Sequence, residues 1–145
     1  MNKRNYYIFA LIIILLAVGT WFFTTNSTKS LADDVFKDIK SDTVSSIEIE
    51  KDNKEKVTIT DKVEIEKILN SLSSIEVKKN SNNSKEFNEV YTIFVFVNED
   101  RRLGMFLYDD KYIDIYDYKA SPKKNSSMDY KISNNFDLKV IQDYF

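Results

Sequence analysis

Residues 90–118 read VYTIFVFVNEDRRLGMFLYDDKYIDIYDY, and this stretch decides the fold. Residues 90–97 are apolar at nearly every position, as in a strand buried on both faces, so we place them at the centre of a sheet. Polar turn residues then separate two further alternating stretches, at residues 103–108 and 112–118. Consecutive strands joined by short turns pair antiparallel, so this region predicts a β-meander.

The residues before the meander predict a hairpin and a helix. Alternating apolar residues on both sides of Asp52-Asn53 indicate a β-hairpin over about residues 44–61. Asp61 and Glu64 form a capping-box pattern, and the apolar positions after it recur at helical spacing. We therefore predict a helix over residues 61–73 that covers one face of the sheet.

Shorter elements are predicted on both sides of these. Ser30 is a candidate cap for a short helix over about residues 31–39, and a strand is expected at residues 75–77. A last strand is expected at residues 128–132, before a short C-terminal helix capped by Ser133 or Asn134.

An uncharged apolar run occupies residues 6–23. As a helix it would be about 27 Å long, close to the roughly 30 Å thickness of a bilayer core, so we predict a transmembrane anchor. Lys3 and Arg4 precede the run and predict a cytoplasmic N-terminus. The alternative is a signal peptide cleaved after the small residues around Ala17-Val18-Gly19, which would give a secreted protein.

The predicted fold class is therefore α+β. A single N-terminal transmembrane helix precedes a small, mostly antiparallel sheet, ββαβ and then a β-meander, with one covering helix and a short C-terminal helix. The predicted organisation has four parts: a cytoplasmic N-terminus (1–5), the anchor (6–23), a tether with a short helix (24–43) and an extracytoplasmic α+β domain (44–145). The expected localisation is the cell membrane, single-pass, with the C-terminal domain outside.

The composition excludes several kinds of chemistry. The chain has no His and no Cys, which removes histidine-based catalytic triads and the usual zinc ligands. A net charge of −2 does not favour nucleic-acid binding. The carboxylates Asp109, Asp110, Asp114 and Asp117 could bind Ca²⁺, but they lack the Asp-x-Asp-x-Asp-Gly pattern. We expect no catalytic residue, cofactor or metal site.

Three tyrosines alternate in the last strand of the meander. Tyr112, Tyr116 and Tyr118 share a period of two with Asp114, while Ile113 and Ile115 occupy the opposite face and suit the core. Tyrosine is also a good strand former whose ring packs across strands while its hydroxyl stays in water. We therefore keep two interpretations open: an ordinary half-exposed strand, or a face that binds a partner through Tyr112, Asp114, Tyr116 and Tyr118.

A family resemblance follows from the order of these segments. The apolar N-terminal run, Ile47-Glu48-Ile49, the passage from Val57 into Ile65–Leu69, the Tyr-rich meander and Tyr130-Lys131-Ile132 occur in turn. This order resembles small exported or lipoprotein-like domains of unknown function from Bacillus and Clostridium relatives. The abundance of Lys, Asn and Ile is also typical of AT-rich Gram-positive bacteria. The resemblance implies an extracytoplasmic α+β domain and carries no activity and no functional residues.

The functional hypothesis is a membrane-anchored, non-enzymatic domain that binds another protein or a cell-envelope component. Residues 6–23 would contact the membrane, and the envelope partner would be a protein or a glycan. Two alternatives stay open: an inhibitor or immunity protein against an exported toxin, and a small carbohydrate-binding module.

Overall fold

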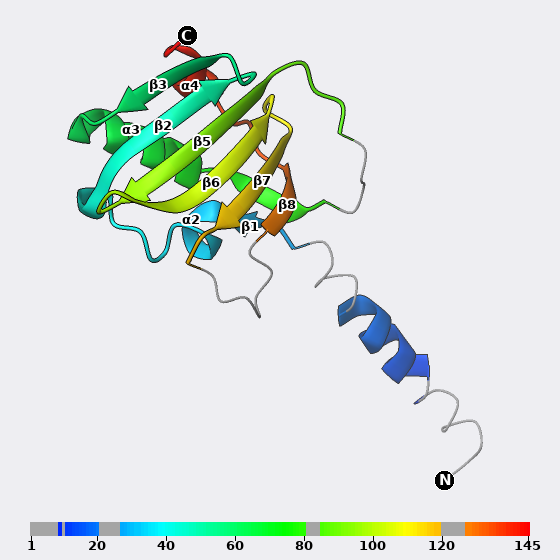
Figure 1. Cartoon of the computed structure of the whole chain (residues 1–145). Coiled ribbons are helices and arrows are strands. Elements are labelled where there is room, and N and C mark those ends of the chain that lie inside the picture. The colour runs from blue at the N-terminus through cyan, green and yellow to red at the C-terminus, as the bar shows by residue number, and fades with distance from the viewer. Residues whose placement is uncertain (1–8, 10, 21–26, 81–84, 120–126) are drawn as a thin grey trace.

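The computed structural model describes residues 9, 11–20, 27–80, 85–119 and 127–145. Within them, eight strands form one antiparallel sheet in the order β1-β4-β8-β7-β6-β5-β2-β3 (Figure 1). The strands are β1 (Lys29–Ser30), β2 (Val44–Lys51), β3 (Glu55–Ile59), β4 (Glu76–Lys79), β5 (Val90–Val97), β6 (Asp100–Tyr108), β7 (Tyr112–Asp117) and β8 (Ser127–Ile132). The helices are α2 (Leu31–Asp34), the 3₁₀ turn η1 (Ser41–Thr43), α3 (Lys62–Ser73) and α4 (Lys139–Gln142).

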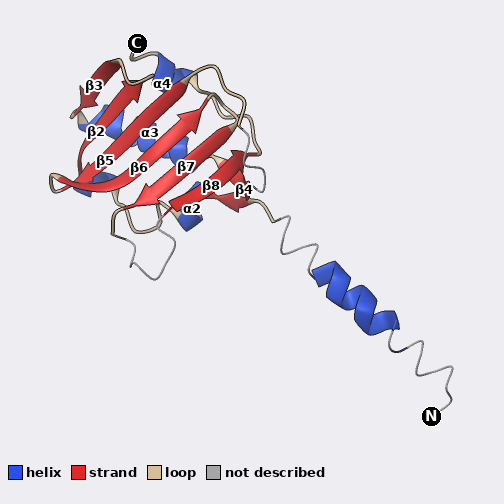
Figure 2. Cartoon of the chain, turned by 45° about the vertical axis from the view of Figure 1, so that its right-hand side comes forward, coloured by secondary structure: helices blue, strands red, loops and turns tan. Residues whose placement is uncertain are grey.

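The helices α2, α3 and α4 lie on the same side of the sheet (Figures 1 and 2). We call this side the inner face and the opposite side the outer face. The longest of these helices, α3, buries its apolar stripe against the inner face, and its other residues are exposed or half-buried. Inward-facing residues of the strands, such as Ile49, Ile93 and Ile113, complete the core. Burial of these aliphatic side chains supplies the main stabilising term, at about 25 cal/mol per Å² of apolar surface.

The meander has the neighbour order expected from its short turns. β5, β6, β7 and β8 are consecutive in the sheet, and β5 lies in its interior between β6 and β2. A three-residue turn, Asp52 to Lys54, joins β2 to β3, and a two-residue turn, Asn98-Glu99, joins β5 to β6; φ is positive at Asp52, Asn53, Asn98 and Glu99. Such turns match the right-handed twist of paired strands, and Asn and Asp tolerate that conformation better than most residues do.

The helix predicted over residues 61–73 is α3, and its cap has the expected geometry in part. The Asp61 carboxylate accepts hydrogen bonds from the backbone N–H groups of Val63 and Glu64, both at 3.0 Å. Glu64 does not complete a capping box, because its carboxylate accepts a hydrogen bond from the Tyr144 hydroxyl instead. This bond ties the C-terminal segment to α3.

Two terminal segments also join the core. Ser30 caps α2, as predicted, by accepting from the Ala32 N–H, and Leu31 is fully buried. The prediction that Ser133 or Asn134 caps the C-terminal helix is wrong. Asn134 bridges the corner between α3 and β4, accepting from the Glu76 N–H and donating to the Ser74 carbonyl. α4 begins only at Lys139, without a side-chain cap.

The prediction of a transmembrane helix is contradicted by the structure. Within the part of residues 6–23 that the structure describes, residue 9 and residues 11–20 are helical. No helix of the described residues is both long and apolar enough to cross a membrane. This finding contradicts the membrane anchor in the predicted fold class and the single-pass localisation. The rest of the predicted anchor lies outside the described residues, as do residues 81–84 of the polar segment 80–88, which the sequence predicts as a loop, and the predicted loop at 121–125.

Candidate functional site: the outer face of the sheet

Aromatic side chains gather on the outer face of the meander. Cross-strand register places Phe94 of β5 opposite Gly104 of β6, and Gly104 opposite Tyr116 of β7. One pair further along, Phe106 lies opposite Asp114. Paired residues of neighbouring strands point to the same side of a sheet, so these side chains share one surface. We call Phe94, Phe106, Tyr108, Tyr116 and Tyr118 the aromatic face.

Gly104 gives the aromatic face its close ring packing. A Cβ atom at this position would lie 3.2 Å from the Phe94 ring and 3.3 Å from the Tyr118 ring, tighter than ordinary van der Waals contact. The two rings therefore approach the β6 backbone where another residue would place a side chain. Tyr118 also meets Tyr116 edge-on, with ring centroids 4.7 Å apart, a favourable geometry for aromatic pairs.

A shallow cleft of about 460 Å³ opens on this surface. Its lining consists mainly of aromatic rings with one carboxylate: Phe106, Tyr108, Asp114, Ile115, Tyr116, Tyr118 and Ser127. Three of the rings are well exposed, at 38% for Phe106, 40% for Tyr116 and 45% for Tyr118. This volume falls within the roughly 300–1,000 Å³ common for ligand pockets. The cleft is thus a mainly apolar surface that is open to solvent, on the side of the sheet opposite the buried core.

Lys85 lies beside two residues of the cleft, Asp114 and Tyr108. Asp114 and Asp129 lie opposite each other on β7 and β8, where two like charges repel. The Lys85 ammonium sits between them, 2.5 Å from Asp114 and 3.3 Å from Asp129, and 4.6 Å from the Tyr108 ring centroid. Burial alone would lower the pKa of Lys85, but its hydrogen bonds and charge interactions with the two carboxylates outweigh burial and raise it.

The other oxygen of Asp114 is also engaged. It accepts a hydrogen bond of 3.1 Å from the Tyr108 hydroxyl. Burial, and then the charge of Asp114, raise the pKa of Tyr108 above its ordinary value, so this hydroxyl stays protonated at neutral pH. With both oxygens bonded inside the domain, Asp114 fixes the geometry of the cleft and is poorly placed to act as a free base.

The structure brings together three of the four residues of the predicted face. Asp114, Tyr116 and Tyr118 line the cleft, whereas Tyr112 is half-buried at the other end of β7 and does not line it. Sequence reasoning missed Phe106, Tyr108 and Lys85. Phe106 and Tyr108 could have been found, since they alternate with the buried Met105 and Leu107 on a strand paired with β7. Lys85 arrives from a polar segment whose sequence gives no signal.

The acidic residues considered as Ca²⁺ ligands do not form one cluster. Asp114 bonds Lys85, and Asp117 forms an ion pair with Arg102. Asp109 accepts hydrogen bonds from the backbone of Asn88 and Glu89 and pairs with Lys111. Across the described residues, no group of three or more such side chains is arranged to hold a metal ion. Each of these three carboxylates instead has a bonding partner within the fold.

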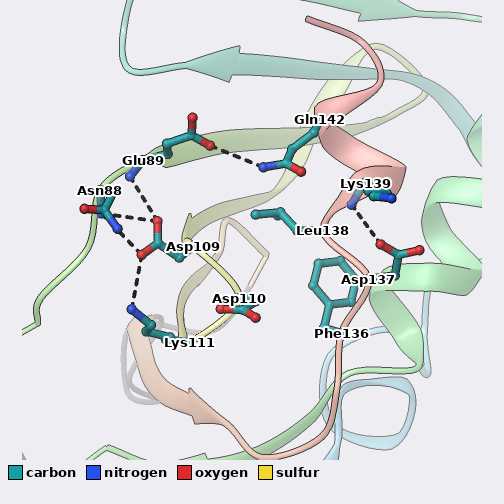
Figure 3. A pocket seen from close by; sticks show the side chains of 10 residues that line it. All are labelled: Asn88, Glu89, Asp109, Asp110, Lys111, Phe136, Asp137, Leu138, Lys139 and Gln142. Atoms are coloured by element: carbon teal, nitrogen blue, oxygen red, sulfur yellow. Dashed lines mark hydrogen bonds and ion pairs between the residues drawn. The ribbon is translucent and has the colours of Figure 1, made fainter.

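A second hollow, of about 560 Å³, lies where the strand ends meet the C-terminal segment (Figure 3). Its polar groups bond to one another: Glu89 accepts from the Gln142 amide at 3.3 Å and pairs with Lys51 at 3.1 Å. The Asp137 carboxylate accepts from the Lys139 backbone N–H. The Glu89–Gln142 bond ties the C-terminal segment to the residue that precedes β5, which is a structural role. The aromatic face, whose rings are exposed, is therefore the stronger candidate for a functional site.

The fold and this face define a class of protein: a small antiparallel sheet, covered by short helices on the inner face, with an exposed aromatic cleft on the outer face. The chain belongs to the DUF5301 family, described as a domain of unknown function (DUF5300), whose model matches residues 36–120. Most of the residues of the cleft lie within that match. No curated protein and no solved structure matches the chain significantly. The family match confirms the predicted membership of an uncharacterised domain family.

Proposed function

We propose that this chain is a non-enzymatic binding domain whose aromatic face binds another protein. The observation that carries the proposal is the contiguous group of exposed rings around an open cleft, on the face opposite the helices. Scattered exposed apolar residues are normal, but contiguous exposed apolar patches mark interaction surfaces. Aromatic residues and arginine are also enriched where proteins bind each other.

The polar groups of the cleft favour binding over catalysis. A nucleophile needs an adjacent base, and Asp114, the one carboxylate among the described residues that line the cleft, is bonded to Lys85 and to the Tyr108 hydroxyl. Neither His nor Cys occurs in the chain. The aromatic rings, by contrast, offer apolar area that is partly rigidified by Gly104 and by ring–ring contact. This combination supports recognition without a chemical step.

The two bonds of Asp114 also favour a protein partner over the alternative functions. Sugar-binding sites place rings beside polar side chains that bond sugar hydroxyls, but Asp114 already has both oxygens occupied. A carbohydrate-binding module is therefore less favoured than a protein partner. An inhibitor of a toxin would be a special case of the proposed function, with a toxin as the protein that covers the aromatic face.

Site-specific photo-crosslinking tests the proposal. A photoreactive phenylalanine analogue replaces Tyr116 on the outer face and, in a control chain, Val63, which is 75% exposed on α3 of the inner face. Each variant is expressed in cells of the native host, irradiated, and its adducts are identified by mass spectrometry. We expect one protein to be captured reproducibly from position 116 and not from position 63. Equal capture from both positions, or none from either, would contradict the proposal.

A stability measurement shows whether Tyr116 belongs to a binding surface or to the core. Tyr116 is partly exposed, so truncation to Ala is expected to cost no more than about 1 kcal/mol of folding free energy. If Tyr116→Ala unfolds the domain, the aromatic face is part of the core and cannot serve as the binding surface.

A further inference from the structure

The Arg101 guanidinium lies over rings of the aromatic face. Its guanidinium carbon is 3.9 Å from the centroid of the Phe94 ring and 5.7 Å from that of Tyr118, and it is also within cation–π distance of Phe96. A cation–π contact of this kind attracts the guanidinium to the rings without using its N–H donors in hydrogen bonds, so they stay available to an acceptor. The side chain is exposed, so an incoming group can reach it.

A β-bulge places Arg101 on this face. The register between β5 and β6 shifts after the pair Val95–Leu103, so that Phe96 pairs with Arg101 and Arg102 is the extra residue. Without the shift, Arg101 would have the same parity as Leu103, which points into the core. Bulges redirect side chains and are common beside functional sites. The two neighbouring arginines thereby acquire different environments.

Arg101 and Arg102 differ in burial and in ion pairing. Arg102 is buried and forms an ion pair with Asp117, which accounts for its charge within the fold. Arg101 has no ion pair among the residues that the structure describes. Lys119, which directly follows the cleft residue Tyr118, is likewise exposed with no ion pair in the described residues.

Three carboxylates of the outer face are paired with lysines, whereas Glu50, further along β2, has no ion pair among the described residues. Lys85 binds both Asp114 and Asp129, and Glu48 pairs with Lys56 at 2.9 Å. The aromatic face carries at its edge the Arg101 cation, which has no ion pair among the described residues, next to a cleft lined mainly by aromatic rings. A partner complementary to it combines a negative charge with a bulky apolar group.

We propose that Arg101 selects the partner of the aromatic face. The partner presents an acidic peptide segment in which an Asp or Glu carboxylate takes a bidentate bond from Arg101 while a neighbouring aromatic or aliphatic side chain fills the cleft beside Tyr116 and Tyr118. This inference rests on the proposed function and adds the chemistry of the partner. Arginine suits the role because its planar donor fork matches the two oxygens of a carboxylate.

Selection from a phage library of randomised short peptides, carried out on the full chain, tests this inference. Enriched peptides are synthesised, and their dissociation constants are measured for the wild-type chain and for Arg101→Gln, Arg101→Lys and Tyr116→Ala. Lys67→Gln is the matched control, because it removes one exposed positive charge from α3 on the inner face. Thermal unfolding of each variant verifies that the fold is retained.

The expected result is enrichment of peptides that join an acidic and a bulky apolar residue. Arg101→Gln should weaken them about 10- to 100-fold, the range for a hydrogen bond to a charged group, while Lys67→Gln should leave the affinity unchanged. Amidation of the peptide carboxylate should cause the same loss and add little to Arg101→Gln in a double-mutant cycle. Arg101→Lys should recover only part of the affinity, because a lysine cannot form the bidentate bond.

Two contrary outcomes are distinguishable. Peptides that need Tyr116 but bind Arg101→Gln as tightly as the wild type would overturn the role of Arg101 and leave the proposed function standing. No enrichment, or enrichment of peptides indifferent to Tyr116→Ala, would overturn both.

Discussion

At the scale of single residues, Lys85 has the clearest measurable role. It lies between two carboxylates of neighbouring strands, with its side chain only 13% exposed. Lys85→Met should keep most of the packing of the stem but leave Asp114 and Asp129 facing each other without a counter-charge. We expect a loss of about 1–3 kcal/mol in the free energy of unfolding, measured by urea denaturation.

A second substitution shows whether charge is the cause. Lys85→Met combined with Asp129→Asn removes one of the two facing carboxylates, so it should be more stable than Lys85→Met alone. If the double variant is no better, or if Lys85→Met is itself neutral, the ammonium does not hold the two strands together.

The residue scale also shows what sequence reasoning could and could not reach. Tyr116, Tyr118 and Asp114 were accessible because a period of two on one strand fixes which residues share a face. Arg101 was not accessible, since its direction depends on a bulge whose position is set by pairing with β5 rather than by any local signal. Tyr112 has the same parity as Tyr116 but lies outside the cleft, because the cleft occupies only one end of β7.

At the scale of elements, local signals predicted α3, the turns and most strands, whereas long-range contacts decided β1 and the neighbour order at the edges of the sheet. Asp61 and the apolar stripe lie within a single stretch of chain, so the helix follows from its own sequence. The sheet contact of β1 requires Lys29 and Ser30 to meet Val77 and Glu76, and no periodicity within two residues can predict such a strand. The apolar run over residues 6–23 predicted a membrane-spanning helix, and the described residues contain no helix that meets that requirement.

The cap of α3 provides a test at this scale. Asp61→Ala removes the acceptor of two backbone N–H groups and should cost about 1 kcal/mol of stability, within a usual range of about 0.5–2 kcal/mol. Asp61→Ser, which keeps a capping oxygen, should retain most of the stability under the same denaturant titration. Equal losses for the two variants would show that the cap itself contributes nothing.

The contact between α3 and the C-terminal segment should depend on pH. Burial, followed by the hydrogen bond to Glu64, raises the pKa of Tyr144 to about 12, above the value of about 10 for an unfolded chain. A raised pKa in the folded state means that the stabilisation is fully present below about pH 10 and disappears as the pH rises through about 12. Tyr144→Phe should therefore be less stable than the wild type by about 1 kcal/mol near neutrality.

The Tyr144→Phe variant also tests the direction of the pH dependence. The stability difference between the wild type and Tyr144→Phe, measured by urea unfolding at a series of alkaline pH values, should shrink above about pH 10. Subtraction removes the titration of the other Tyr and Lys side chains, which the two chains share. A difference that stays constant, or that grows with pH, would contradict the assigned bond.

At the scale of the whole molecule, the folded unit extends beyond the family match. The match covers residues 36–120, yet the sheet order places β4 between β1 and β8, and both of these strands lie outside the match. Leu31 and Ile141 are fully buried, and Tyr130 of β8 donates a 2.8 Å hydrogen bond to Asp34 at the end of α2. The two terminal regions thus meet each other and close the core from one edge of the sheet.

This arrangement predicts different behaviour for two fragments. A fragment of residues 27–145 contains every strand of the sheet and should unfold in one cooperative transition, with dispersed amide signals in an NMR spectrum. A fragment of residues 36–120 lacks β1, β8, α2 and α4, so β4 and β7 lose their partners at that end of the sheet and the inner face loses buried area. It should give collapsed amide dispersion and no cooperative transition. If the shorter fragment folds as cooperatively as the longer one, the terminal segments are accessories, and the domain is the matched region alone.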